Sequence, residues 1–233
     1  MATQQTALIV GAGTGLSASL ARLLAKNGVR VALAARNADK LAGLAKETGA
    51  KAFSCDATDA AAVGRLFDAA SREVGEPDLV VYNASGRARG PITDLDPVEV
   101  EKAIRVTCFG GFLVAQAAAK RMVPRGSGAI FFTGASASVK GYPNSSSFAM
   151  GKFGLRGLAQ SLARELQPKN IHVAHFVIDG GIAKGPADPR ANERGADGLL
   201  LPDAIADTYF HVWRQHRSAW TWEVELRPWV EKF

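Results

Sequence analysis

The sequence has few of the residues that build disulfide frameworks or metal centres. Cysteine occurs only at Cys55 and Cys108 among 233 residues, which argues against a disulfide framework. Both lie in apolar segments, so we expect two buried thiols. His172 and His175 lie three apart on a predicted strand and therefore point to opposite faces, and no cysteine accompanies them. We expect no metal site.

Long apolar runs and long basic runs are missing as well. No apolar stretch approaches the roughly 18 residues that span a bilayer, and residues 1–6 do not resemble a signal peptide. The formal net charge is +6, but Lys and Arg are scattered, with no basic run longer than two. We expect a cytoplasmic protein that binds neither membranes nor nucleic acid.

Strand-like and helix-like segments alternate along the whole chain. The expected strands are 6–10, 30–35, 50–55, 79–82, 129–133, 171–178 and 219–226, and the expected helices are 16–26, 38–47, 60–74, 97–123, 146–166 and 203–215. Strands joined by helices of this length predict right-handed crossovers and a parallel sheet. We therefore expect residues 1–233 to form one α/β domain, a doubly wound Rossmann sheet of about seven strands with helices on both faces. Ligands of such sheets bind outside the carboxyl ends of the strands.

A glycine-rich turn joins the first strand to the first helix. Its sequence, Gly11-Ala12-Gly13-Thr14-Gly15-Leu16-Ser17, fits a G-x-x-x-G-x-G spacing in which Ser17 replaces the last glycine. Glycines at this place let the backbone approach a pyrophosphate held at the helix N-terminus. The turn predicts a dinucleotide site, with contacts from Gly11, Gly13, Thr14, Gly15 and Leu16.

Polar residues follow the next three strands. Arg36 lies 21 residues after Gly15, where an acidic residue would bind the ribose 2′-hydroxyl of NAD. An arginine instead offers donors to a 2′-phosphate, so we expect NADP(H) to be preferred over NAD(H). Asp56 either accepts a hydrogen bond from the adenine or caps the turn 56–59. The expected cofactor contacts at these strand ends are Arg36, Asp56, Ala57, Asn83, Ala84 and Ser85.

From about residue 6 to residue 181 these motifs resemble the short-chain dehydrogenase/reductase family. Residues 11–17 resemble its T-G-x-x-x-G-x-G loop, residues 83–86 its N-A-G motif, residues 148–152 its Y-x-x-x-K, and Asp179-Gly180 its P-G pair. The resemblance implies an NADP(H)-dependent oxidoreductase acting on a small carbonyl or alcohol substrate. It also implies that Lys152 binds the nicotinamide ribose, that Gly180 and Ile182 contact the cofactor, and that the protein is a homodimer or homotetramer.

Three of the family's four catalytic side chains have no counterpart at the aligned positions. Phe148 stands at the position of the general-acid tyrosine, Ala135 at that of the serine and Thr107 at that of the asparagine; Lys152 matches. Hydride transfer to a carbonyl without a proton donor leaves an alkoxide in a low-dielectric site. A positioned acid contributes about 10²–10⁴ in rate, so the usual route would be slow.

Two hypotheses follow for the function. The first is an oxidoreductase with an altered proton-delivery site, in which Ser136 or Tyr142 acts with Lys152; Ser138 and Asp179 are further candidates. The second is a catalytically inactive NADP(H)-binding sensor or assembly partner. Isomerisation or dehydration on the same fold is a smaller alternative.

Two other regions bear on substrate and assembly. Residues 180–202 are rich in glycine, proline and charge, which indicates a mobile substrate loop or lid rather than a packed element. Small residues cluster on two long helices, at Gly110, Gly111 and Ala115 and at Gly151, Gly154 and Gly157. Because glycine in a helix costs about 1 kcal/mol relative to alanine, we expect these clusters to allow close packing.

Overall fold

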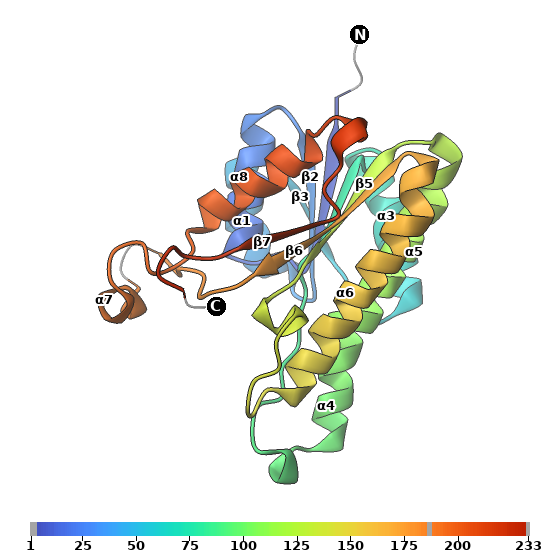
Figure 1. Ribbon diagram of the computed structural model, residues 1–233. Helices are drawn as coiled ribbons and strands as arrows, with labels where there is room; N and C mark the ends of the chain where they lie inside the picture. The colour runs from blue at the N-terminus through green and yellow to red at the C-terminus, as the bar shows by residue number, and fades with distance from the viewer. Residues whose placement is uncertain (1–3, 186–187, 232–233) are drawn as a thin grey trace.

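A single parallel sheet organises the chain, whose computed structural model describes residues 4–185 and 188–231 (Figure 1). The described part forms seven strands in the order β3-β2-β1-β4-β5-β6-β7, and every pair is parallel. The strands are β1 (Thr6–Val10), β2 (Arg30–Ala35), β3 (Lys51–Ser54), β4 (Leu79–Tyr82), β5 (Gly128–Thr133), β6 (Ile171–Ile178) and β7 (Glu223–Leu226). The predicted doubly wound α/β sheet is confirmed.

Helices connect successive strands. They are α1 (Leu16–Lys26), α2 (Ala42–Thr48), α3 (Ala60–Glu73), α4 (Pro97–Ile104), α5 (Gly110–Arg125), α6 (Ser146–Leu166), α7 (Arg190–Arg194) and α8 (Pro202–Trp213). Short 3₁₀ helices lie at Ala38–Leu41, Ile92–Asp94, Ser136–Ser138, Gln167–Lys169 and Arg217–Ala219. Asp59 and Asp96 cap α3 and α4 as expected, because each carboxylate accepts a backbone N–H of the first turn.

Two apolar layers cover the faces of the sheet. Alternate strand residues such as Ile9 and Phe131 pack against α1 and α8, and their neighbours such as Leu8 and Phe132 pack against α3, α5 and α6. Figure 1 shows these two groups of helices on opposite sides of the sheet. In the same view α4 and the start of α6 extend beyond the carboxyl edge of the strands. α4 and the start of α6 therefore border the region where a ligand is expected.

The long helix predicted at 97–123 is confirmed, but it contains a π-helical turn. A π-helical segment, Arg105–Phe109, separates α4 from α5. The Thr107 hydroxyl accepts a hydrogen bond from the Gly86 N–H at 2.9 Å, and the Tyr82 hydroxyl donates to the Val106 carbonyl. Through these two hydrogen bonds, residues at and just after the end of β4 bind the π segment. π-helical segments are frequent at functional sites.

Several small residues of α5 and α6 are explained within the chain. A Cβ added at Gly111 would lie 2.6 Å from Leu155, and one at Gly154 would lie 2.8 Å from the Cys108 sulfur. The two helices therefore need glycine to approach one another and the π segment. Cys55 is buried as expected, and burial raises the pKa of its thiol to about 11. Full burial of Cys108 was a wrong prediction, because its side chain is only half-buried at this helix junction.

The last predicted strand is shorter than expected. Residues 217–219 form a 3₁₀ turn that the His216 side chain caps, and β7 begins only at Glu223. β7 still pairs in parallel with β6, so the sheet has the expected number of strands.

Candidate functional site

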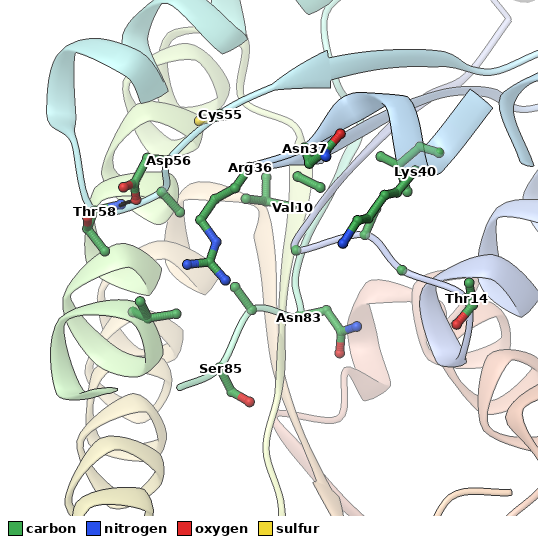
Figure 2. Close-up of a pocket in the computed structure, with 18 residues that line it drawn as sticks. Val10, Thr14, Arg36, Asn37, Lys40, Cys55, Asp56, Thr58, Asn83 and Ser85 are labelled. Atoms are coloured by element: carbon green, nitrogen blue, oxygen red, sulfur yellow. Dashed lines mark hydrogen bonds between the residues drawn. The ribbon is translucent and has the colours of Figure 1, made fainter. Parts of the chain in front are cut away.

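Two cavities meet at the carboxyl edge of the sheet. The first, of about 760 Å³, is lined by the glycine turn and the residues that follow β2, β3 and β4 (Figure 2). The second, of about 550 Å³, is lined by the ends of β5 and β6, the start of α6 and part of 180–190. Asn83 and Ser85 line both cavities. They are therefore where the two cavities adjoin, at the place in the fold where a ligand is expected.

The glycine turn presents bare backbone to the first cavity. Gly11 has a φ of +83°, and a Cβ there would lie 2.3 Å from the Ala84 nitrogen, so only glycine fits. A Cβ added at Gly13 would meet no atom within 4 Å. Ser17 accepts a hydrogen bond from the Asn83 amide at 2.7 Å, which joins the turn to the end of β4. An extended phosphate-bearing ligand could thus lie against the backbone.

The predicted residues of this turn divide into two groups. Gly11, Gly13 and Thr14 line the first cavity. Gly15 is the N-cap of α1 without a side-chain cap, and the Leu16 side chain is buried in the core below. Their contribution to a ligand site would therefore come from the backbone at the helix N-terminus.

Two cations reach into the first cavity. Figure 2 shows Arg36, which follows β2, and Lys40, from the next 3₁₀ helix, extending into the same space. Among the described residues neither side chain makes a hydrogen bond or ion pair. Sequence reasoning found Arg36 but missed Lys40, although a second basic residue at the start of the helix predicted at 38–47 was a usable signal.

Asp56 lies near Arg36, whose charge acts on its carboxylate, and Ala57 follows it in the chain. The Asp56 carboxylate accepts hydrogen bonds from the Thr58 N–H at 2.9 Å and from its hydroxyl at 2.8 Å. These bonds lower the pKa of Asp56 from its usual value. Of the two roles considered for Asp56, the structure shows the turn cap. The carboxylate lines the cavity as well, and so do Ala57, Asn83, Ala84 and Ser85.

Lys152 is a buried basic residue that lines the second cavity. Its side chain is 3% exposed, and its ammonium donates to the Thr133 carbonyl at 2.6 Å. Burial, together with the nearby charge of Arg87, lowers the pKa of Lys152 to about 7. Both protonation states are therefore populated near neutral pH.

Phe148 lies one helical turn before Lys152 and faces the same cavity. The Arg87 guanidinium carbon is 3.7 Å from the centre of the Phe148 ring, and the Lys152 ammonium is 5.8 Å from it. One aromatic ring thus contacts two cations. Sequence reasoning missed Arg87, because its distance from Phe148 along the chain gives no local signal.

The candidate proton donors are separated by the structure. Ser136 and Tyr142 line the second cavity with Lys152, whereas Ser138 and Asp179 do not. The Ser138 hydroxyl is fully buried, where it accepts from the Ala135 N–H. Asp179 forms buried ion pairs with Lys140 at 2.9 Å and Arg227 at 3.0 Å. The hypotheses that Ser138 or Asp179 supplies the proton are therefore wrong.

Residues 180–202 contribute to the second cavity through Gly180, Gly181, Ile182 and Arg190. The segment is more structured than expected, because it contains α7 and a β-bridge between Ile182 and Leu200. The buried Asp188 carboxylate also binds Arg190 at 2.6 Å. The expectation of an unpacked segment was wrong for its described part, and movement as a lid stays a prediction.

No three His, Cys, Asp or Glu side chains among residues 4–185 and 188–231 are placed to hold a metal ion. No helix in the described part is both long and apolar enough to cross a membrane.

Comparisons with known proteins agree with this arrangement. The cis-4-hydroxycyclohexanecarboxylate dehydrogenase of Sinomonas cyclohexanicum is 32% identical over 216 residues, which are 88% of this chain and 87% of the relative. The solved structure of a short-chain dehydrogenase from Rhodopseudomonas palustris has 35% identity and a TM-score of 0.83, covering 97% of this chain and 99% of the other.

A metagenomic short-chain oxidoreductase solved in complex with NADP has 26% identity and a TM-score of 0.82, over 97% of this chain and 98% of the other. A family model described as short chain dehydrogenase matches residues 5–191. With its seven-stranded parallel sheet and the cleft at its carboxyl edge, this chain belongs to the short-chain dehydrogenase family.

Proposed function

We propose that this protein is an NADP(H)-dependent oxidoreductase that interconverts a small carbonyl compound and an alcohol with an altered proton-delivery site. The observation that carries the proposal is the junction of the two cavities at Asn83 and Ser85. A dinucleotide lying along the first cavity would extend toward Lys152 in the second. When bound, its nicotinamide would supply or accept the hydride.

The first cavity fits a phosphorylated dinucleotide. The glycine turn leaves an open backbone surface, since a Cβ at Gly13 or Gly15 would project into empty space. Arg36 and Lys40 supply two unpaired cations where a 2′-phosphate would lie. The structure of the metagenomic relative in complex with NADP supports the same cofactor class. Gly180 and Ile182 would contact the nicotinamide end from the second cavity.

The spacing from Lys152 places Phe148 where the family has its general-acid tyrosine. We assign proton delivery to Lys152 with the hydroxyl of Ser136 or Tyr142, because all three line one cavity. With a pKa of about 7, the Lys152 ammonium can donate a proton to a developing alkoxide at neutral pH. In the reverse direction the neutral amine can accept it.

The test begins with fluorescence titration of NADPH and NADH, followed by consumption of each across a panel of carbonyl compounds. We expect tighter binding of NADPH. Arg36→Asp should weaken NADPH binding about 10- to 150-fold, the range for a charge-assisted hydrogen bond. It should affect NADH far less. Arg72→Asp, on the exposed side of α3 and outside both cavities, is the matched control.

Each negative result has a distinct meaning. Tight NADPH binding without turnover, even in Phe148→Tyr, would replace the proposal with the inactive sensor or assembly partner. Equal affinity for the two cofactors would refute the NADP(H) preference. Failure to bind either cofactor would refute the proposed function altogether.

We also infer a homodimer or homotetramer. Several large apolar side chains are exposed on the π segment, α5 and α6, namely Phe109, Phe112, Met150 and Phe153. Exposed apolar clusters of this kind are typical of interaction surfaces. Light scattering after size-exclusion chromatography measures the mass directly, and a monomer at micromolar concentration would contradict the inference.

A further inference from the structure

We propose that the second cavity contains an oxyanion-binding subsite centred on Arg87, so that the substrate is a carbonyl or hydroxy compound that carries a carboxylate or phosphate group. That the bound anion is a substrate rests on the function proposed above. The anion subsite itself rests only on the charges, contacts and packing of the residues around this cavity.

The charge of the cavity wall is one-sided. Its lining includes four basic side chains and no Asp or Glu: Arg87, Arg89, Lys152 and Arg190. Arg190 is neutralised by Asp188, which it binds through two nitrogens. Among the described residues, Arg87 and Arg89 make no hydrogen bond or ion pair with any carboxylate. The apo cavity therefore has uncompensated positive charge.

The arginines of this chain differ in their partners. Arg156 is bidentate to Glu223, and Arg121 pairs with both Asp68 and Glu76. These two guanidinium groups are partly buried, whereas Arg87 is exposed, like Arg36 and Arg89, for which the described residues provide no carboxylate either. Arg87 instead packs the flat face of its guanidinium on the Phe148 ring. Its positive charge is therefore not paired with a carboxylate of the described residues.

The stacking geometry leaves hydrogen-bond donors available. With its carbon 3.7 Å from the Phe148 ring centre, the Arg87 guanidinium contacts the ring as a cation–π pair. Its N–H donors lie in the plane of the guanidinium, in the fork that binds carboxylate or phosphate through two bonds. A cation held on a ring is therefore still able to bind an oxyanion from its edge.

The backbone on both sides of Arg87 is held in place. The Gly86 N–H donates to the Thr107 hydroxyl at 2.9 Å. Ala88 exchanges two hydrogen bonds with Ser147, at 3.0 Å from its N–H and at 2.7 Å to its carbonyl. Because the binding group is already positioned, less conformational entropy is lost when an anion binds.

Repulsion among the cations points the same way. Burial and the charge of Arg89 lower the pKa of Arg87, and Arg87 in turn contributes to the lowered pKa of Lys152. A bound oxyanion would relieve both effects. A substrate without charge would leave the repulsion unrelieved, so the cavity favours an anionic ligand over its neutral analogue.

Matched substrate pairs test the proposal in the NADPH-loaded protein. We would compare 2-oxo and 4-oxo acids with their methyl esters, and dihydroxyacetone phosphate with dihydroxyacetone. We expect at least one anion to exceed its neutral partner in kcat/KM by about 10- to 150-fold, the range for a charge-assisted hydrogen bond. In Arg87→Met this ratio should fall close to one, whereas Arg87→Lys should retain part of it. The carboxylate and phosphate pairs show which oxyanion is preferred.

A binding measurement separates this proposal from the proposed function. Calorimetric titration of 4-oxopentanoate and of inorganic phosphate into the NADPH-loaded protein needs no turnover. The subsite would be supported if these anions bind the wild type and Arg72→Met but not Arg87→Met, even if every reduction assay failed. If the protein does not bind NADPH, the same titration is made with the apo protein. Turnover of neutral compounds with no preference for anions, together with anion binding that Arg87→Met does not weaken, would overturn the subsite and leave the oxidoreductase proposal standing.

Discussion

Removing the buried ammonium of Lys152 should change how stability depends on pH. The folded protein lowers the pKa of Lys152 from the ordinary 10.5 to about 7, chiefly by burial. The unfolded chain therefore binds more protons than the folded chain between these two values. Stability contributed by this group rises with pH across that window, and its penalty is fully present below pH 7.

The magnitude follows from the two pKa values. From pH 6 to pH 9, linkage gives about 2.5–3 kcal/mol of increased stability for the wild type relative to Lys152→Met. The variant also removes the donor to the Thr133 carbonyl. That loss shifts the free energy of unfolding by the same amount at every pH, so it does not alter the predicted difference.

Urea unfolding of the apo protein, followed by tryptophan fluorescence at pH 6, 7.5 and 9, measures this difference. Other titrating groups are common to both proteins and cancel in the comparison. Lys46→Met, at an exposed position of α2, is the control and should show no such trend. If the difference in free energy of unfolding between the wild type and Lys152→Met stays constant from pH 6 to pH 9, the folded state does not lower the pKa of Lys152. The assignment of this group to proton delivery would then lose its basis.

Three further substitutions test other parts of the structure. Phe148→Tyr should raise carbonyl reduction by about 10²–10⁴ by adding an acid one turn before the lysine, whereas Phe148→Leu should not; equal rates in both would contradict the assigned position. Glu223→Gln should lower the free energy of unfolding by about 1.5–3 kcal/mol, measured in urea, because the carboxylate accepts from His175 and from a bidentate arginine; an unchanged midpoint would refute this role. Gly11→Ala should destabilise the fold by more than about 1 kcal/mol, since φ is +83° there. Gly13→Ala, with open space at its Cβ, should fold normally but bind NADPH more weakly; normal NADPH binding by both variants would exclude the glycine turn from the cofactor site.

Much of the fold could be predicted because its signals are local. Six of the seven strands lie within one or two residues of the expected bounds, since each is a short apolar run bounded by turn residues. The residues proposed to bind the cofactor also followed from position, because those at the ends of β1 to β4 come directly after a parallel strand. Gly11, Arg36 and Asn83 accordingly line the same cavity although they belong to three different connections.

The failures share one cause. Ser138 and Asp179 were considered as proton donors because they lie near the expected strand ends, and sequence position says nothing about their partners. In the folded chain Asp179 is bound by Arg227, 48 positions away along the chain, and Ser138 turns into the core. The π turn within the helix expected at 97–123 was not predicted for the same reason, since contacts from the end of β4 accompany it.

The sequence by itself determined the order of strands and helices, the open glycine turn and the position of Lys152 four residues after Phe148. These depend on hydrophobic periodicity and spacing, which act over a few residues. Only the tertiary structure decided that Arg87 stacks on Phe148 and that Arg87 and Lys152 line one cavity. It also decided that burial brings the pKa of Lys152 to about 7. Desolvation and charge proximity depend on which distant segments pack together, so the chemistry of the site became visible only in the folded chain.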